Sequence, residues 1–194
     1  MHRLYYIMGK SATGKDTIYR ELHERFGFQP LILYTTRPMR QNEENGREYF
    51  FIDRETLHKM HAKDQILESR SYETVHGIWT YCTARNFDLD SESRFGVGTI
   101  ESYLSIREKL GAENIVPIYI EVDDRTRLLR AIERESREPQ LNYEELCRRF
   151  LADAKDFSEM HLAGAGITRR FINDDLAHCL AEIEAFIRTM EETQ

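Results

Sequence analysis

The stretch from Gly9 to Thr17 carries the residue types best suited to phosphate chemistry. It reads Gly-Lys-Ser-Ala-Thr-Gly-Lys-Asp-Thr and lies between an apolar run at 4–8 and a helical pattern that begins near residue 16. Two glycines with four residues between them, the second followed by lysine, match a phosphate-binding loop between a strand and a helix. Backbone N–H groups and the helix N-terminus would attract the anion, and Lys15 would reach the β- and γ-phosphates. The predicted triphosphate-binding residues are Gly9, Ser11, Ala12, Thr13, Gly14, Lys15, Asp16 and Thr17.

One position of this loop departs from the expected pattern. Serine or threonine normally follows the lysine, but here Asp16 follows it and the hydroxyl comes one residue later, at Thr17. A carboxylate can also hold a hard cation. Asp16 and Thr17 are therefore the candidate ligands for Mg²⁺.

A second polar segment, residues 35–49, could also hold a phosphate. Arg37 and Arg40 are three residues apart in a loop punctuated by Pro38 and Gly46, directly after an apolar run. Two guanidinium groups can clamp a phosphate bidentately, and Tyr49 could add a hydroxyl. Composition alone favours a solvated surface loop over a phosphate clamp, so both interpretations remain open.

The elements around these loops alternate between strand and helix. Strands are expected at 4–8, 31–34, 50–52, 66–72, 75–81, 95–100, 115–122 and 167–172, with turns around Glu73 and Gly77. Helices are expected at 16–26, 54–62 (capped by Asp53), 101–110, 124–136, 143–160 and 174–190. This alternation predicts an α/β fold with a parallel sheet between helices, interrupted by a small β-rich insertion. Ligands of such sheets bind at the carboxyl ends of the strands, where the Gly9 loop is expected.

Composition narrows the class of protein. The 194 residues carry a net charge of −7, which argues against a nucleic-acid or membrane-surface binder. The three cysteines, Cys82, Cys147 and Cys179, lack metal-ligand spacing, so we expect reduced thiols in a cytoplasmic protein. The chain has no apolar run long enough to span a bilayer, and its N-terminus runs straight into a strand without room for a signal peptide. His58 and His61 lack a third ligand and are interpreted as surface residues.

Three segments resemble the guanylate kinase family. Thr35-Thr36-Arg37-Pro38-Met39-Arg40, followed by Glu43, Gly46 and Tyr49, is similar to that family's acceptor-binding segment. Near the C-terminus, Asn173-Asp174-Asp175 resembles the family's strand-end motif, and residues 149–154 resemble the segment after its mobile lid. The resemblance runs over nearly the whole chain in the family's order.

The resemblance implies a fold and an activity. It implies a P-loop NTPase-type core at 1–34 and 86–194, a helical lid near 134–149, and an acceptor-binding insertion at 35–85. The implied reaction moves the γ-phosphoryl group of MgATP onto GMP, in a monomer or homodimer whose partners are small nucleotides. Two alternatives remain: a different acceptor, as in ribose 1,5-bisphosphokinase with its Gly-Lys-Asp loop, and a non-catalytic guanylate-kinase-like binding domain.

The resemblance also assigns roles to individual residues. Arg37, Arg40 and Tyr49 would hold the acceptor phosphate, Glu43 would orient the arginines, and Tyr81 would supply a further hydroxyl. Glu68 would accept hydrogen bonds from guanine, and Asn173 would lie beside the adenine of ATP. Arg137 and Arg149 would be the catalytic lid arginines, with Arg134 and Arg148 as rivals.

Some positions depart from the family's pattern. Ala12 replaces a loop glycine, and Leu33 stands where a serine is frequent. The family's guanine-reading aspartate after the 95–100 strand is absent, so that Thr99 or Glu101 would have to serve.

Overall fold

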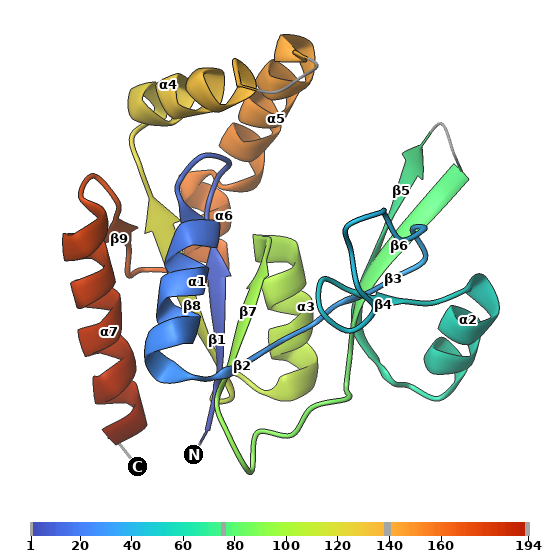
Figure 1. The fold of residues 1–194 in the computed structure, drawn as a ribbon. Helices are drawn as coiled ribbons and strands as arrows, with labels where there is room; N and C mark the ends of the chain where they lie inside the picture. Colours follow the sequence, from blue (N-terminus) through green and yellow to red (C-terminus); the bar gives the residue numbers. More distant parts are fainter. Residues whose placement is uncertain (1, 75–76, 138–140, 193–194) are drawn as a thin grey trace.

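The central sheet of the molecule contains five parallel strands. In the computed structural model, which describes residues 2–74, 77–137 and 141–192, the strand order is β2 (Gln29–Pro30), β7 (Arg94–Gly98), β1 (Leu4–Met8), β8 (Ile115–Glu121) and β9 (Phe171–Ile172) (Figure 1). The parallel α/β sheet expected from the alternation of elements is therefore confirmed.

Helices cover both faces of this sheet. On β1 the even-numbered residues pack in one buried cluster with α3 (Ile100–Leu110), and the odd-numbered residues pack in another with α1 (Lys15–Phe26) and α7 (Leu176–Glu192). Successive strand residues point to opposite faces, so β1 must be apolar throughout. All five of its residues are buried, which fixes the position of the loop that follows.

Two further helices lie beyond the carboxyl ends of β1 and β8. They are α4 (Asp124–Glu135) and α5 (Tyr143–Asp156), which lie above the loop between β1 and α1 in Figure 1. Arg127 of α4 is fully buried, and its guanidinium lies 4.4 Å from the ring centroid of Phe150 on α5. This contact joins the two helices at their inner surfaces.

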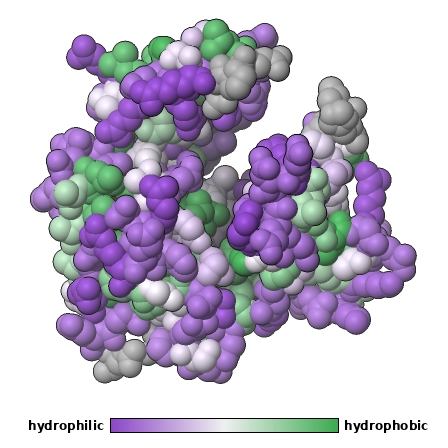
Figure 2. Space-filling view, viewed as in Figure 1, coloured by the Kyte–Doolittle hydropathy of each residue, from purple (hydrophilic) through white to green (hydrophobic). Residues whose placement is uncertain are grey.

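A second, mixed sheet lies beside the core as an insertion. Its order is β4 (Phe50–Phe51), β3 (Tyr34–Thr35), β6 (Gly77–Ala84) and β5 (Ile66–Thr74), with α2 (Arg54–Ala62) alongside. The Asp53 carboxylate accepts a hydrogen bond from the Thr56 N–H at 2.7 Å, as expected for a helix N-cap. Figure 2 shows a hollow between the insertion and the rest of the molecule. The proposed boundaries at 35 and 85 stay a prediction.

Two strands expected from the sequence differ from the structure. Apolar residues there predict burial, but burial does not require pairing in a sheet. Residues 31–33 are not a strand, because the chain leaves the central sheet after Pro30 and joins the second sheet at Tyr34. Leu31 is nevertheless buried in the core. Between residues 167 and 172, only Phe171–Ile172 pairs with β8.

The expected helix at 143–160 is wrong in its length. It is divided into α5 and α6 (Glu159–Gly164), with Phe157 and Ser158 between them. Phe157 is buried and stacks on Tyr119 with ring centroids 5.8 Å apart. This burial turns the chain, and Ser158 begins the next helix in an extended conformation typical of an N-cap.

Smaller differences occur at element ends. Ile100 begins α3 instead of ending a strand, because Thr99 caps that helix through the Ser102 N–H. Glu73 and Gly77 lie within strands instead of turns, and Val75, His76 and residues 138–140 lie outside the described residues. Within the described ranges, none of the helices has the length and apolar character required to cross a membrane.

Candidate active site

The loop between β1 and α1 is tightly folded around its two glycines. A Cβ on Gly9 would lie 2.7 Å from the Ile120 carbonyl oxygen, so that only glycine fits there. Gly14 has φ of 83°, and a Cβ on it would lie 2.6 Å from the Asn173 amide nitrogen. The Thr13 hydroxyl donates to the Lys10 carbonyl oxygen at 2.8 Å, which closes the turn. The sequence spacing thus forms the curled backbone that an anion site requires.

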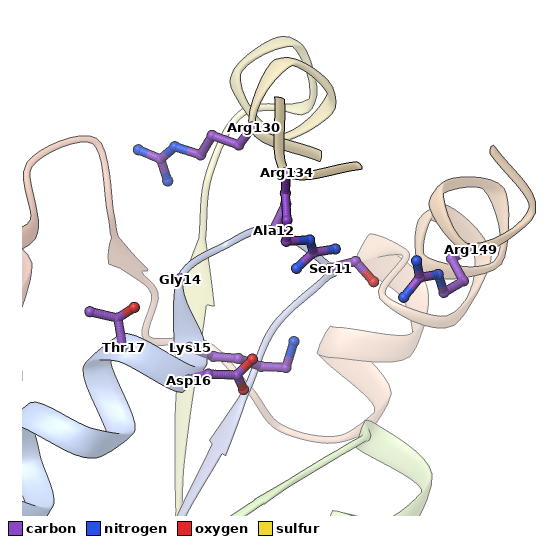
Figure 3. Close-up of a pocket in the computed structure, with 9 residues that line it drawn as sticks. All are labelled: Ser11, Ala12, Gly14, Lys15, Asp16, Thr17, Arg130, Arg134 and Arg149. Atoms are coloured by element: carbon purple, nitrogen blue, oxygen red, sulfur yellow. The ribbon is translucent and has the colours of Figure 1, made fainter. Parts of the chain in front are cut away.

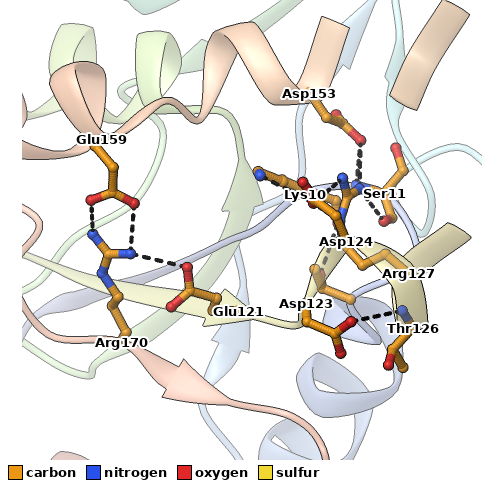
Figure 4. Close-up of polar contacts among 11 residues, drawn as sticks. Lys10, Ser11, Glu121, Asp123, Asp124, Thr126, Arg127, Asp153, Glu159 and Arg170 are labelled. Carbon is orange, nitrogen blue, oxygen red and sulfur yellow. Dashed lines mark hydrogen bonds and ion pairs between the residues drawn. The ribbon is translucent and has the colours of Figure 1, made fainter. Parts of the chain in front are cut away.

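Three other elements hold this loop in place. Figure 4 shows Ser11 between α4 and α5: its carbonyl oxygen accepts from Arg127 at 3.0 Å, and its N–H donates to Asp153 at 2.6 Å. From the C-terminal side, the Asn173 amide donates to the Thr13 carbonyl oxygen at 2.8 Å. The loop is therefore fixed by groups far away in the sequence.

Above the loop lies a strongly cationic cavity. It has a volume of about 330 Å³ and is lined by Ser11, Ala12, Gly14, Lys15, Asp16, Thr17, Arg130, Arg134 and Arg149. In Figure 3 the side chains of Arg134 and Arg149 point from α4 and α5 toward the loop. Four cations, with one carboxylate, make the cavity suited to a polyphosphate.

A neighbouring cavity continues toward the C-terminal motif. It has a volume of about 430 Å³, and its walls include Ala12, Gly14, Arg130 and Asn173. Asn173 is buried and its carbonyl oxygen accepts from Arg130 at 3.1 Å. The two cavities share Ala12 and Gly14 of the loop, Thr17 of α1 and Arg130, so a long ligand could occupy both.

The structure separates the candidate lid arginines. Arg149 and its rival Arg134 line the phosphate cavity. Arg137 is exposed and pairs with Glu133 at 2.5 Å, and Arg148 is exposed and pairs with Glu145. The lid role assigned to Arg137 stays a prediction. Because Arg134 lines the cavity and Arg137 does not, the structure favours Arg134 for that role.

Sequence reasoning missed Arg130. Arg130 and Arg134 are four residues apart on α4, and side chains at that spacing share one helix face. This periodicity, together with the buried Arg127, could have indicated which face of the helix meets the loop.

The second polar segment forms a preorganised arginine site. Arg37 is only 4% exposed, and its Nη2 donates to Glu43 at 2.6 Å. The other Glu43 oxygen accepts from the Arg40 backbone N–H at 2.8 Å. The hydrogen bond from Arg37, followed by that from Arg40, lowers the pKa of the Glu43 carboxyl below its usual value. Glu43 therefore connects the Arg37 guanidinium to the Arg40 backbone, and its role in orienting the arginines toward a phosphate stays a prediction.

Aromatic rings extend this site across the second sheet. The Arg37 guanidinium carbon lies 5.5 Å from the Tyr49 ring centroid, and Tyr49 lies 5.6 Å from Tyr81. Thr35 holds the start of the segment, because its hydroxyl accepts from the Arg37 N–H and donates to the Thr80 carbonyl oxygen. The structure thus brings Arg37, Glu43, Tyr49 and Tyr81 together, while the Arg40 side chain remains exposed.

Glu68 is buried, and both of its oxygens have partners. Oε1 accepts from the Thr83 hydroxyl at 2.8 Å, and Oε2 accepts from Arg70 Nε at 3.1 Å. The side chain is 2% exposed. A buried carboxylate requires such partners, since an unpaired charge there would be very costly.

Among the described residues, groups of three or more side chains suited to binding a metal do not occur. Asp16 and Thr17 nevertheless lie on the wall of the phosphate cavity, at the start of α1. Mg²⁺ commonly uses one or two protein oxygens and takes its other ligands from phosphates and water. These two residues therefore fit a magnesium–nucleotide site.

The fold, the glycine loop and the two arginine-rich clusters define a P-loop protein with the layout of a nucleotide kinase. The sequence model of the family described as guanylate kinase matches residues 1–189. The chain therefore belongs to the guanylate kinase family.

Individual relatives agree with this assignment. A guanylate kinase of Koribacter versatilis is 39% identical over a stretch that covers 44% of this chain and 40% of that protein, which is less than half of its length. A guanylate kinase of Dechloromonas aromatica is 30% identical over 95% of this chain and 88% of that protein. The crystal structure of guanylate kinase from Anaplasma phagocytophilum superimposes with a TM-score of 0.66 at 18% identity, covering 100% of this chain and 87% of that one, and supports the fold.

Proposed function

We propose that this protein transfers the γ-phosphoryl group of ATP to the phosphate of GMP. The observation that carries the proposal is the convergence of Lys15, Arg130, Arg134 and Arg149 on one cavity above the phosphate-binding loop. A second anion site, built on Arg37 and Glu43, lies on the insertion and supports a reaction between two phosphorylated substrates. The intact loop disfavours a purely structural guanylate-kinase-like domain.

The chemistry requires positioning and charge neutralisation more than proton transfer. Phosphoryl transfer spreads negative charge over the oxygens of the transferred group, and fixed cations stabilise that charge. Lys15 and the loop N–H groups would hold the β- and γ-phosphates, and Arg134 and Arg149 would neutralise the group in transfer. Arg37, Arg40 and Tyr49 would align the acceptor phosphate with it.

Other residues would complete the nucleotide site. Asn173 and Arg130 border the cavity where the rest of ATP would extend. Asp16 and Thr17 would hold Mg²⁺, which supplies charge neutralisation at the phosphates when bound. Closure of α4 and α5 against the insertion would exclude water from the transferred group.

Product analysis tests the proposal. The protein is incubated with ATP, magnesium and GMP, and the nucleotides are separated by chromatography. We expect ADP and GDP to appear in equal amounts. ADP without GDP would identify hydrolysis, and the absence of both products would refute the transfer.

A further inference from the structure

Ser11 of the phosphate-binding loop is held by residues of both α4 and α5. Its carbonyl oxygen accepts from Arg127 of α4 at 3.0 Å, and its N–H donates to the Asp153 carboxylate of α5 at 2.6 Å (Figure 4). The two holding residues also approach each other, because Arg127 Nη1 lies 3.5 Å from Asp153 Oδ2. One loop residue, one arginine and one carboxylate thus join three elements that are far apart in the sequence.

The Arg127 side chain is fixed in this arrangement by several partners. It is completely buried, and its guanidinium lies 4.4 Å from the ring centroid of Phe150. Its Nε and Nη2 donate to Asp124 at 3.2 and 2.8 Å, and Asp124 also pairs with Lys10 of the loop at 3.4 Å. Because a buried cation that loses its partners is very costly, Arg127 is a fixed point between α4 and the loop.

Asp153 has the wrong charge to be a ligand of a phosphate. Its carboxylate lies close to a cavity whose cations attract phosphate, and its side chain is only 18% exposed. A negative charge there would repel the nucleotide unless a nearby cation offset it, and Arg127 is such a cation. The contact that accounts for Asp153 at this place is its hydrogen bond to Ser11, which has the short length typical of a charged acceptor.

The two holding residues share helix faces with the cations of the phosphate cavity. On α5, Asp153 follows Arg149 by four residues. On α4, Arg134 follows Arg127 by seven residues. Both spacings place side chains on one face of a helix. Arg134 and Arg149 line the same cavity as Ser11, so the contacts to Ser11 fix where these cations stand relative to the loop.

We propose that Asp153 is a positioning residue for phosphoryl transfer, which acts through its hydrogen bond to the Ser11 N–H. This bond holds α5 on the loop and so places Arg149 over the transferred group, while Arg127 does the same for α4. All groups of this anchor belong to the protein, so it forms without nucleotide. The inference rests on the proposed function and names what places the cations that this function requires.

Steady-state kinetics with ATP and GMP test the role of Asp153. Asp153→Ala removes the acceptor of the Ser11 N–H, and kcat should fall by about 10- to 100-fold, since a misplacement of about 1 Å costs as much. The KM of GMP should stay the same, because the acceptor site lies on the insertion. Asp153→Asn keeps an oxygen acceptor at the same place and should restore kcat to within about threefold of that of the unmodified protein.

A control on the same helix separates this role from a general structural defect. Glu144→Ala removes an exposed carboxylate from α5 and should leave kcat and both KM values unchanged. All variants are assayed well below their melting temperatures, so that unfolded protein does not contribute. An unchanged kcat in Asp153→Ala would overturn the inference. A loss that Asp153→Asn does not restore would also overturn it, because the hydrogen bond to Ser11 would then not be the cause.

Amide hydrogen exchange without added nucleotide tests the anchor independently of activity. Residues 9–17 should exchange about tenfold faster or more in Asp153→Ala, and at the unmodified rate in Glu144→Ala. A lower kcat with unchanged exchange would overturn the anchor. If no variant forms GDP but exchange follows the expected order, the transfer reaction fails while the anchor stands. If GDP forms and Asp153→Ala changes neither kcat nor exchange, the anchor fails while the proposed function stands.

Discussion

Arg127 donates a hydrogen bond to the carbonyl oxygen of Ser11 at 3.0 Å, although the arginine side chain is completely buried. The same guanidinium pairs with Asp124 at 2.8 Å. Asp153 accepts from the Ser11 N–H, so the backbone of one loop residue is held through both its N–H and its carbonyl oxygen. The shape of the phosphate site therefore depends on α4 and α5 as well as on the loop itself.

Replacing Arg127 should loosen this attachment. Arg127→Met keeps most of the side-chain volume but removes the buried cation, and we expect the free energy of unfolding to fall by about 3 kcal/mol. Urea denaturation measures this loss. Arg125→Met, an exposed neighbour on the same helix, should change stability by less than about 0.5 kcal/mol. Equal losses in the two variants would contradict a specific role for Arg127.

Ala12 has an unfavourable backbone conformation. Its φ is 63°, in the left-handed region where a Cβ costs about 1 kcal/mol or more. Ala12→Gly should raise the free energy of unfolding by about 0.5–1 kcal/mol, once the greater freedom of glycine in the unfolded chain is included. Ala112→Gly, in an exposed turn without positive φ, should be destabilising instead. A stabilising effect in both variants would contradict the explanation.

Lys15 is expected to be essential for transfer and dispensable for folding. It begins α1 and lines the phosphate cavity. Lys15→Met should lower kcat by at least about 100-fold, because a fixed cation at the transferred group is lost. The melting temperature should remain within about 2 °C of that of the unmodified protein, and the exposed Lys63→Met should retain full turnover. Near-normal turnover in Lys15→Met would refute the assignment.

The two arginines of the insertion should differ in their effects. Arg40 has an exposed side chain, so Arg40→Ala should raise the KM of the acceptor by about tenfold while the KM of ATP and the stability stay the same. Arg37 is buried against Glu43, so Arg37→Ala should raise the acceptor KM and also lower the stability. Kinetics with varied acceptor or varied ATP separate these effects. A rise confined to the KM of ATP would mean that these arginines contact ATP and not the acceptor.

The loop and the fold class could be predicted because their signals are local. Glycine spacing, the apolar strand at 4–8 and the cap at Asp53 each depend on neighbouring residues. The lid arginines could not be chosen in this way, since Arg130, Arg134 and Arg137 all lie within an evenly charged stretch. The burial of Arg127 against Phe150, which is a tertiary contact, shows which side of α4 faces the loop.

The pairing of Glu68 with Arg70 also depends on tertiary structure. Alternation along a strand places both residues on one face. The sequence could not reveal that Thr83 and Arg70 occupy the two carboxylate oxygens, because that requires the register between β5 and β6. The division of the helix after Asp156 is a similar case, since it follows from the packing of Phe157 on Tyr119.

The most direct test of the central claim is a coupled assay of ADP release with ATP and a panel of acceptors. The panel contains GMP, dGMP, AMP, UMP and ribose 1,5-bisphosphate, and Lys15→Met serves as the inactive control. Rapid ADP release with GMP, abolished in the control, is the predicted result. ADP release with ribose 1,5-bisphosphate alone, or with none of the acceptors, would contradict the claim that this protein phosphorylates GMP.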